Sequence, residues 1–83
     1  MKDLQSVAWS RKNVVAAVKV GGQWMTRKEA VRVAEKVGIN GFTVAKRKGS
    51  KYITALPGTV GLRDRTGVHV STLKRSIRDR LGV

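Results

Sequence analysis

The chain has 83 residues, of which 18 are lysine or arginine and 5 are aspartate or glutamate, so its formal net charge is +13. A single domain of this length has little apolar surface to spare for deep pockets. Because cysteine is absent, disulfides and zinc fingers are excluded. So basic a composition is typical of proteins that bind nucleic acid, since a polyanionic partner relieves the repulsion among the positive charges.

Catalytic groups are scarce in the sequence. His69 is the single histidine, the acids are scattered, and neither clustered metal ligands nor a glycine-rich phosphate loop is visible. We therefore expect a protein that is not an enzyme, with no catalytic residue, metal or cofactor. No apolar run approaches the roughly 20 residues that span a bilayer, and residues 1–6 lack the apolar core of a signal peptide. We expect a cytoplasmic protein, associated with the nucleoid, without a membrane partner.

The first half of the chain contains one strong local signal. Residues 14–20 fit either a helix or a buried strand, and Gly21-Gly22 ends that element in both cases. Thr26-Arg27-Lys28-Glu29 has the pattern of a capping box, in which the threonine hydroxyl and the glutamate carboxylate each accept from the other residue's amide. The sequence therefore predicts a helix that begins after Thr26 and ends at Gly38.

The second half is less regular. Residues 42–48 fit a helix or a strand, because phenylalanine, threonine and valine favour β structure. Residues 51–56 have β character, which would make Lys48-Gly49-Ser50-Lys51 the turn of a hairpin, and Pro57-Gly58 is a clear break. A last helix is predicted over residues 72–81, with Ser71 as its cap.

An internal repeat appears when the chain is aligned with itself. Residues 33–39 match residues 62–68, and residues 43–46 match residues 72–75. Both copies read as an amphipathic turn, a glycine, a β-branched apolar residue and a short polar turn, followed by threonine, an apolar residue and a basic residue. This pattern resembles the helix–turn–helix of bacterial and phage DNA-binding proteins.

The second copy departs from that motif at Arg63 and Thr66, where a small and an apolar residue are usual. The stretch from Asn13 to Leu56 also resembles a winged helix, with the Lys48–Lys51 hairpin as its wing. The resemblance implies a mainly α fold: a small helix–turn–helix domain, single or tandem, with one short β-hairpin. Its parts would be a lead-in over residues 1–9, a winged-helix-like unit over residues 10–56 and a second helix–turn–helix-like unit over residues 57–83, the two units sharing one core.

The implied partner is duplex DNA, because a recognition helix places its first turn against base edges in the major groove. The protein would then be a small transcriptional regulator or architectural factor of the kind that phages and mobile elements encode. The expected contacts are Asn40, Thr43, Lys46, Arg47 and Lys48 in the first copy, Lys51 in the wing, and His69, Ser71, Thr72, Lys74, Arg75 and Arg78 in the second copy.

Two other functions remain open. The first is an RNA or single-strand binder, in which Trp24, Phe42 and Tyr52 are exposed platforms for bases, although Trp9 and Trp24 also suit a core. The second is an interaction module that docks on an acidic host protein and inhibits it. A homodimer through the valines of residues 14–18 is compatible with any of these functions.

Overall fold

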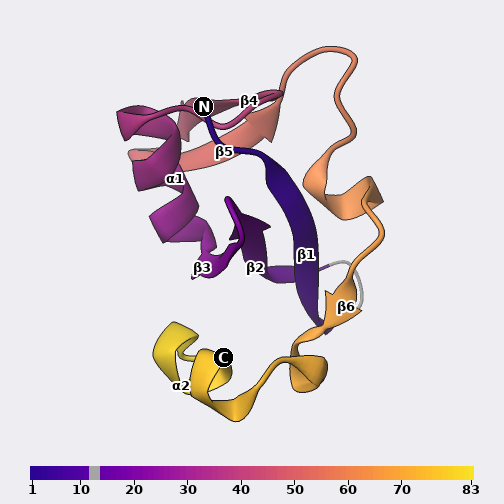
Figure 1. Ribbon diagram of the computed structural model, residues 1–83. Coiled ribbons are helices and arrows are strands. Elements are labelled where there is room, and N and C mark those ends of the chain that lie inside the picture. Colours follow the sequence, from indigo (N-terminus) through magenta and orange to yellow (C-terminus); the bar gives the residue numbers. More distant parts are fainter. Residues whose placement is uncertain (12–13) are drawn as a thin grey trace.

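The computed structural model describes residues 1–11 and 14–83 and is rich in β structure (Figure 1). Strands make up 43% of it and helices 28%, so the expected mainly helical fold is wrong. The elements in chain order are β1 (Leu4–Arg11), β2 (Val14–Val20), β3 (Gln23–Thr26), α1 (Arg27–Lys36), β4 (Phe42–Arg47), β5 (Ser50–Ala55), the short 3-10 helix η1 (Leu62–Asp64), β6 (Val68–His69), a second 3-10 helix η2 (Val70–Thr72) and α2 (Arg75–Leu81).

The main sheet has the strand order β3-β2-β1-β6. Strands β1, β2 and β3 form an antiparallel meander, while β6 pairs with β1 in parallel. Gly21 and Gly22 both have positive φ, as a two-residue hairpin turn between β2 and β3 requires. Residues 14–20 are therefore a strand, and most of the expected lead-in lies in β1, a central strand of this sheet.

Each face of the main sheet is covered by a different part of the chain. On one face, α1 and the β4–β5 hairpin pack against a core that includes Val7, Val18 and Val20. On the other face, Ala8 and Ala17 pack with Leu73 and Leu81, the last residue of α2, and the small alanines let this segment approach the sheet closely.

The aromatic and valine side chains complete these two cores. Trp9 packs against the first core and Trp24 against the second, so both are partly buried. Val15 and Val18 are fully enclosed in the first core, which leaves only Val14 of the expected dimer surface exposed. Two of the three valines of residues 14–18 therefore belong to this chain's own core.

The capping box at the start of α1 is confirmed. The Thr26 hydroxyl accepts from the Glu29 amide at 3.2 Å, and the Glu29 carboxylate accepts from the Thr26 amide at 3.1 Å. Beyond the other end of α1, Gly38 has a φ of +83° and its amide donates to the Val33 carbonyl. The predicted helix therefore begins and ends where the local signals indicate.

The helix–turn–helix and winged-helix predictions are wrong. Helix α1 is followed by strand β4, which contains residues 43–46, and residues 62–68 form η1, a loop and the start of β6. A second helix in the first copy is excluded because residues 42–47 pair along their whole length with β5. Residues 57–83 supply β6 to the main sheet, and their elements are η1, β6, η2 and α2 rather than a helix–turn–helix.

Candidate nucleic-acid interface

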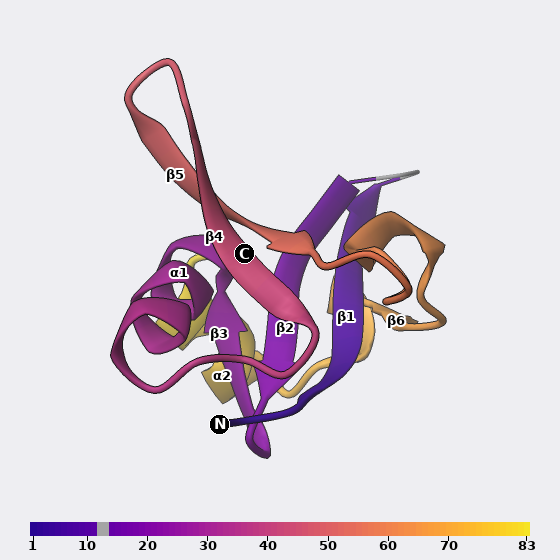
Figure 2. The same cartoon turned by 90° about the horizontal axis from the view of Figure 1, so that it is seen from above.

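The hairpin of β4 and β5 forms a basic arm that reaches beyond the rest of the molecule (Figure 2). Its turn consists of Lys48 and Gly49, which both have positive φ, at +49° and +82°. Two such residues between paired strands make the hairpin turn that matches the natural twist of β-strands. The expected hairpin turn is thus present, at the tip of a longer ribbon whose other strand begins at Phe42.

Four cations gather at the tip of the basic arm: Lys46, Arg47, Lys48 and Lys51, all exposed. Lys46 lies directly opposite Lys51 across the two strands, an arrangement in which like charges repel. The Lys51 ammonium is 2.9 Å from the Glu35 carboxylate of α1. Within residues 1–11 and 14–83, the other three cations make no ion pair, so the tip carries uncompensated positive charge.

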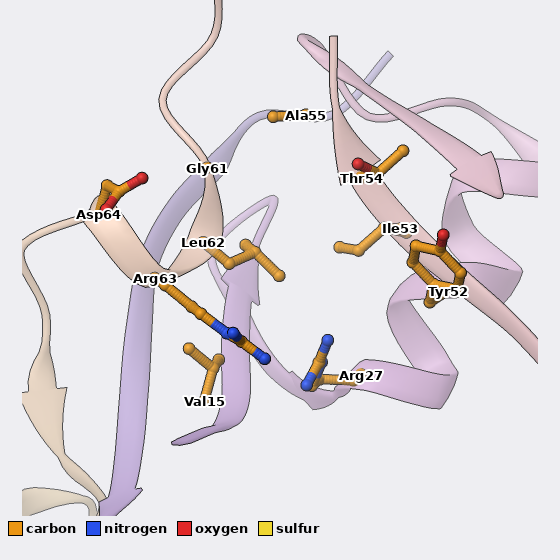
Figure 3. A pocket seen from close by; sticks show the side chains of 10 residues that line it. All are labelled: Val15, Arg27, Tyr52, Ile53, Thr54, Ala55, Gly61, Leu62, Arg63 and Asp64. Carbon is orange, nitrogen blue, oxygen red and sulfur yellow. The ribbon is translucent and has the colours of Figure 1, made fainter. Parts of the chain in front are cut away.

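A hollow of about 360 Å³ lies between β5 and η1, at the base of the arm (Figure 3). The side chains of Arg27 and Arg63 point into it from opposite walls, while the Asp64 carboxylate is turned away from both guanidinium groups. In the described part of the chain, neither arginine has an acidic partner. The hollow is lined by Val15, Arg27, Tyr52, Ile53, Thr54, Ala55, Gly61, Leu62, Arg63 and Asp64.

Both walls of the hollow are fixed by their surroundings. The capping box holds Arg27 at the first position of α1. On the other wall, Leu62 is buried in the first core, and the Arg65 guanidinium donates to the carbonyls of Val60 and Leu4. The loop that carries Arg63 is therefore held by Leu62 in the first core and by the bond from Arg65 to β1, and the two arginines face one another across a space with defined walls.

The hollow continues toward the tip of the arm as a groove between α1 and β5. Two further depressions extend it, and each shares lining residues with the one before. We call the three together the basic groove. Its basic side chains are Arg27, Lys28, Arg32, Lys51 and Arg63, with Tyr52 at the rim. The acids that line it are Glu35, which is engaged by Lys51, and Asp64.

Part of the expected contact set lies on this side of the molecule. Lys46, Arg47, Lys48 and Lys51 form the tip of the basic arm, and Thr43 is exposed in β4 of the same arm. Asn40 precedes the arm, where its side-chain amide donates to the Asp3 carboxylate at 2.8 Å. The amide of Asn40 is thus engaged within the protein itself.

The rest of the expected set lies on the opposite side of the main sheet, around η2 and α2 (Figure 1). His69 Nδ1 accepts from the Ser71 amide, and the Thr72 hydroxyl donates to the His69 carbonyl, so these groups stabilise their own turn. Helix α2 begins after Lys74 without a side-chain cap, which makes the predicted Ser71 cap wrong. Lys74, Arg75 and Arg78 therefore do not join the basic arm in one surface.

The aromatic platforms of the single-strand alternative are only partly available. Phe42 is buried in the first core and Trp24 packs against the second. Tyr52 is 38% exposed and lines the hollow. Of the three expected platforms, Tyr52 alone is both exposed and next to a cluster of cations.

Sequence reasoning missed the contribution of Arg27, Lys28, Arg32 and Arg63 to the groove. One signal pointed to the first two. The first turn of a helix favours acidic side chains, because the helix dipole is positive there. A pair of cations at that position works against the dipole, so stability of the helix does not account for it. For Arg32 and Arg63, no local signal was available, because their place in the groove depends on how α1 and η1 pack against β5 and the first core.

The described residues were also compared with the patterns of metal sites, membrane-spanning helices and known proteins. Among residues 1–11 and 14–83, no group of three or more potential metal ligands comes together. None of the helices described is long and apolar enough to cross a membrane. Comparison of the chain with protein-family models, with curated proteins and with solved structures finds no match.

Proposed function

We propose that this protein binds nucleic acid, with the basic arm and the basic groove as its contact surface. The observation that carries the proposal is the concentration of exposed cations at the tip of a protruding ribbon, where Lys46, Arg47 and Lys48 make no ion pair among the described residues. Like charges held this close together repel one another in the free protein. Phosphate groups at the tip would remove the repulsion and would release their own counterions, which is the main source of affinity in such complexes.

Shape supports duplex DNA as the form to test first. A two-stranded β-ribbon is narrow enough to enter the major groove, and several DNA-binding proteins use strands in this way. The helix–turn–helix resemblance also implied duplex DNA, but the fold does not support that resemblance. The proposed preference for duplex DNA therefore depends only on the narrow shape of the arm. The proposed location at the nucleoid depends in turn on binding to duplex DNA.

The first experiment measures binding of the protein to a labelled blunt DNA duplex over a range of salt concentrations. We expect the logarithm of the association constant to fall linearly with the logarithm of salt concentration, by about 0.9 for each phosphate neutralised. The same titration with duplex RNA and with single-stranded DNA ranks the three forms. Absence of salt-dependent binding to all three would overturn the proposal.

The chain offers a matched pair of variants, because the dipeptide Lys-Arg occurs once on each side of the main sheet. The double variant Lys46→Gln/Arg47→Gln removes two charges from the basic arm. The double variant Lys74→Gln/Arg75→Gln removes the same two charges beside α2, far from the arm in Figure 1. We expect only the arm variant to lower the salt dependence substantially. The opposite ranking would move the contact surface to α2.

A further inference from the structure

We propose that the hollow at the base of the arm is a subsite for one unpaired nucleotide. Its phosphate would lie between Arg27 and Arg63, and its base would stack on Tyr52. The inference rests on the proposed function and goes beyond it, because it assigns a second recognition step to a different set of residues. The arm would bind the backbone of any nucleic acid, whereas the hollow would select strands that have an unpaired base.

The two arginines make the hollow an anion site. Their guanidinium groups enter from opposite walls, and the Asp64 carboxylate faces away from them (Figure 3). Arginine forms paired, parallel hydrogen bonds to phosphate oxygens, which makes it the preferred residue for phosphate recognition. The helix dipole at the start of α1 is not the source of this site, because the Glu29 carboxylate already accepts from the Thr26 amide there.

The size and walls of the hollow fit a nucleotide rather than a bare ion. Its volume of about 360 Å³ lies in the lower part of the range for small-molecule sites, roughly 300–1,000 Å³. Val15, Ile53 and Leu62 give it an apolar floor. Tyr52 at the rim is 38% exposed, and a tyrosine ring in this position can stack on any base.

The geometry also explains why a duplex alone would leave the hollow empty. A base inside a duplex is stacked and paired, and extruding it costs a few kcal/mol. The depressions of the basic groove follow one another from the hollow to the tip of the arm and share lining residues. A single strand that extends from a duplex held by the arm can therefore follow the groove to the hollow.

The test compares two DNA ligands, a blunt duplex and the same duplex with a short single-stranded extension. The quantity measured is the ratio of their affinities at one salt concentration. Because the extension adds phosphates of its own, this ratio is compared between the wild type and the variants below. For the wild-type protein, we expect the extension to raise affinity by about tenfold, the effect of stacking one base. Equal affinity for both ligands would overturn the subsite and leave the proposed function intact, whereas absence of binding to both of them, to duplex RNA and to single-stranded DNA would overturn the proposed function itself.

Three variants locate the effect: Arg27→Gln, Arg63→Gln and Tyr52→Leu, which keeps an apolar side chain but removes the ring. Each should reduce the affinity ratio toward one. The melting temperature should stay the same for Arg63→Gln, whose side chain is exposed, and should not fall for Arg27→Gln, because a cation in the first turn of α1 opposes the helix dipole. Lys74→Gln, which removes a charge on the other side of the sheet, should leave the ratio unchanged. A ratio that all the variants retain would overturn the assignment to this hollow.

A nucleoside monophosphate alone serves as the last probe, followed by NMR. It distinguishes a site that takes a free nucleotide from one that needs the strand attached to the arm. Shifts confined to Arg27, Tyr52 and Arg63 support the subsite for free nucleotides as well. The free nucleotide can also leave those signals unchanged while the single-stranded extension still raises the affinity of the wild type but not of the three variants. In that case, the hollow binds a nucleotide only as part of a strand. Shifts confined to other surfaces would overturn the proposal.

Discussion

The guanidinium of Arg65 lies over the ring of Phe42, 5.1 Å from its centroid. Phe42 is the first residue of β4, so this contact joins the base of the arm to the loop that carries Arg63. The same guanidinium donates to the carbonyl of Val60 at 3.2 Å and to that of Leu4 at 3.5 Å. One side chain thus connects the arm, the wall of the hollow and strand β1.

Replacing Arg65 should loosen that wall. Arg65→Lys keeps the charge but cannot reproduce two separate hydrogen bonds and the stacked guanidinium. We expect it to lower the free energy of unfolding by about 1–2 kcal/mol, from the lost cation–π contact and hydrogen bonds. Chemical denaturation measures the loss. The ratio of affinities for extended and blunt duplex should fall too, and an unchanged unfolding curve would show that the contact contributes nothing.

Gly67 marks the closest approach between the C-terminal segment and the sheet. A Cβ atom at this position would lie 2.3 Å from the Val7 carbonyl oxygen and 2.6 Å from its Cγ2. Because the first of these is a backbone atom of a central strand, Gly67→Ala must displace β6. We expect a loss of about 1–3 kcal/mol in unfolding free energy, as for other overpacked sites.

Gly61→Ala is the matched control for that substitution. Gly61 has an ordinary φ of −68°, and the nearest atom to an added Cβ is an Asp64 carboxylate oxygen at 3.7 Å. The alanine fits and restricts the unfolded chain, so we expect a gain of up to about 1 kcal/mol. Thermal or chemical unfolding of the two variants should show a lower unfolding free energy for Gly67→Ala and a higher one for Gly61→Ala. Equal losses in both would show that the close contact with Val7 is not what requires glycine at position 67.

Lys48→Asn should separate the stability of the arm from its binding. Lysine at a φ of +49° is strained, whereas Asn-Gly is the preferred sequence for this turn. We expect unfolding free energy to rise by a few tenths to about 1 kcal/mol. Affinity for nucleic acid should fall in the same variant, because a cation at the tip is lost. Calorimetry measures the change in unfolding free energy, and the salt titration measures the change in affinity. If both rose or both fell, the stability of the arm and its binding would not be separable at this residue.

Arg27→Glu applies the same logic to α1. An acidic side chain in the first turn of a helix is favoured by the dipole, by about 0.3–1 kcal/mol relative to a neutral one. We therefore expect the variant to melt at a higher temperature than the wild type. It should also lose the preference for the single-stranded extension, because a carboxylate would then face Arg63 across the hollow. A lower melting temperature would mean that Arg27 stabilises the fold through contacts other than the dipole.

The correct sequence predictions were those decided within a few neighbouring residues. Thr26 and Glu29 fix the start of α1 by hydrogen bonds to each other. Both partners are therefore visible in a four-residue stretch of sequence, which is why this helix start could be predicted. The turn at Lys48-Gly49 is local in the same way. Valines over residues 14–20 satisfy both helical and strand periodicity, and only the neighbours on either side, β1 and β3, decide between them.

The internal repeat failed for a related reason. Both copies share a glycine and a β-branched residue after a short helical turn, and these features only describe how a helix ends. The structure of the next segment depends on partners elsewhere in the chain: β5 for residues 43–46, and the sheet for the segment around Leu73. The hollow was unpredictable for the same reason, because Arg27 and Arg63 meet only once η1 packs on the first core.

The pairing of β6 with β1 joins segments from opposite ends of the described chain, whereas β4 and β5 are neighbours. Hairpins of adjacent residues close quickly, while contacts between distant segments form late. During synthesis, the arm can therefore fold before residues 61–64 have emerged from the ribosome to complete the hollow. If the proposed function and subsite hold, a nascent chain would carry the surface for phosphate contacts before it could distinguish a paired base from an unpaired one.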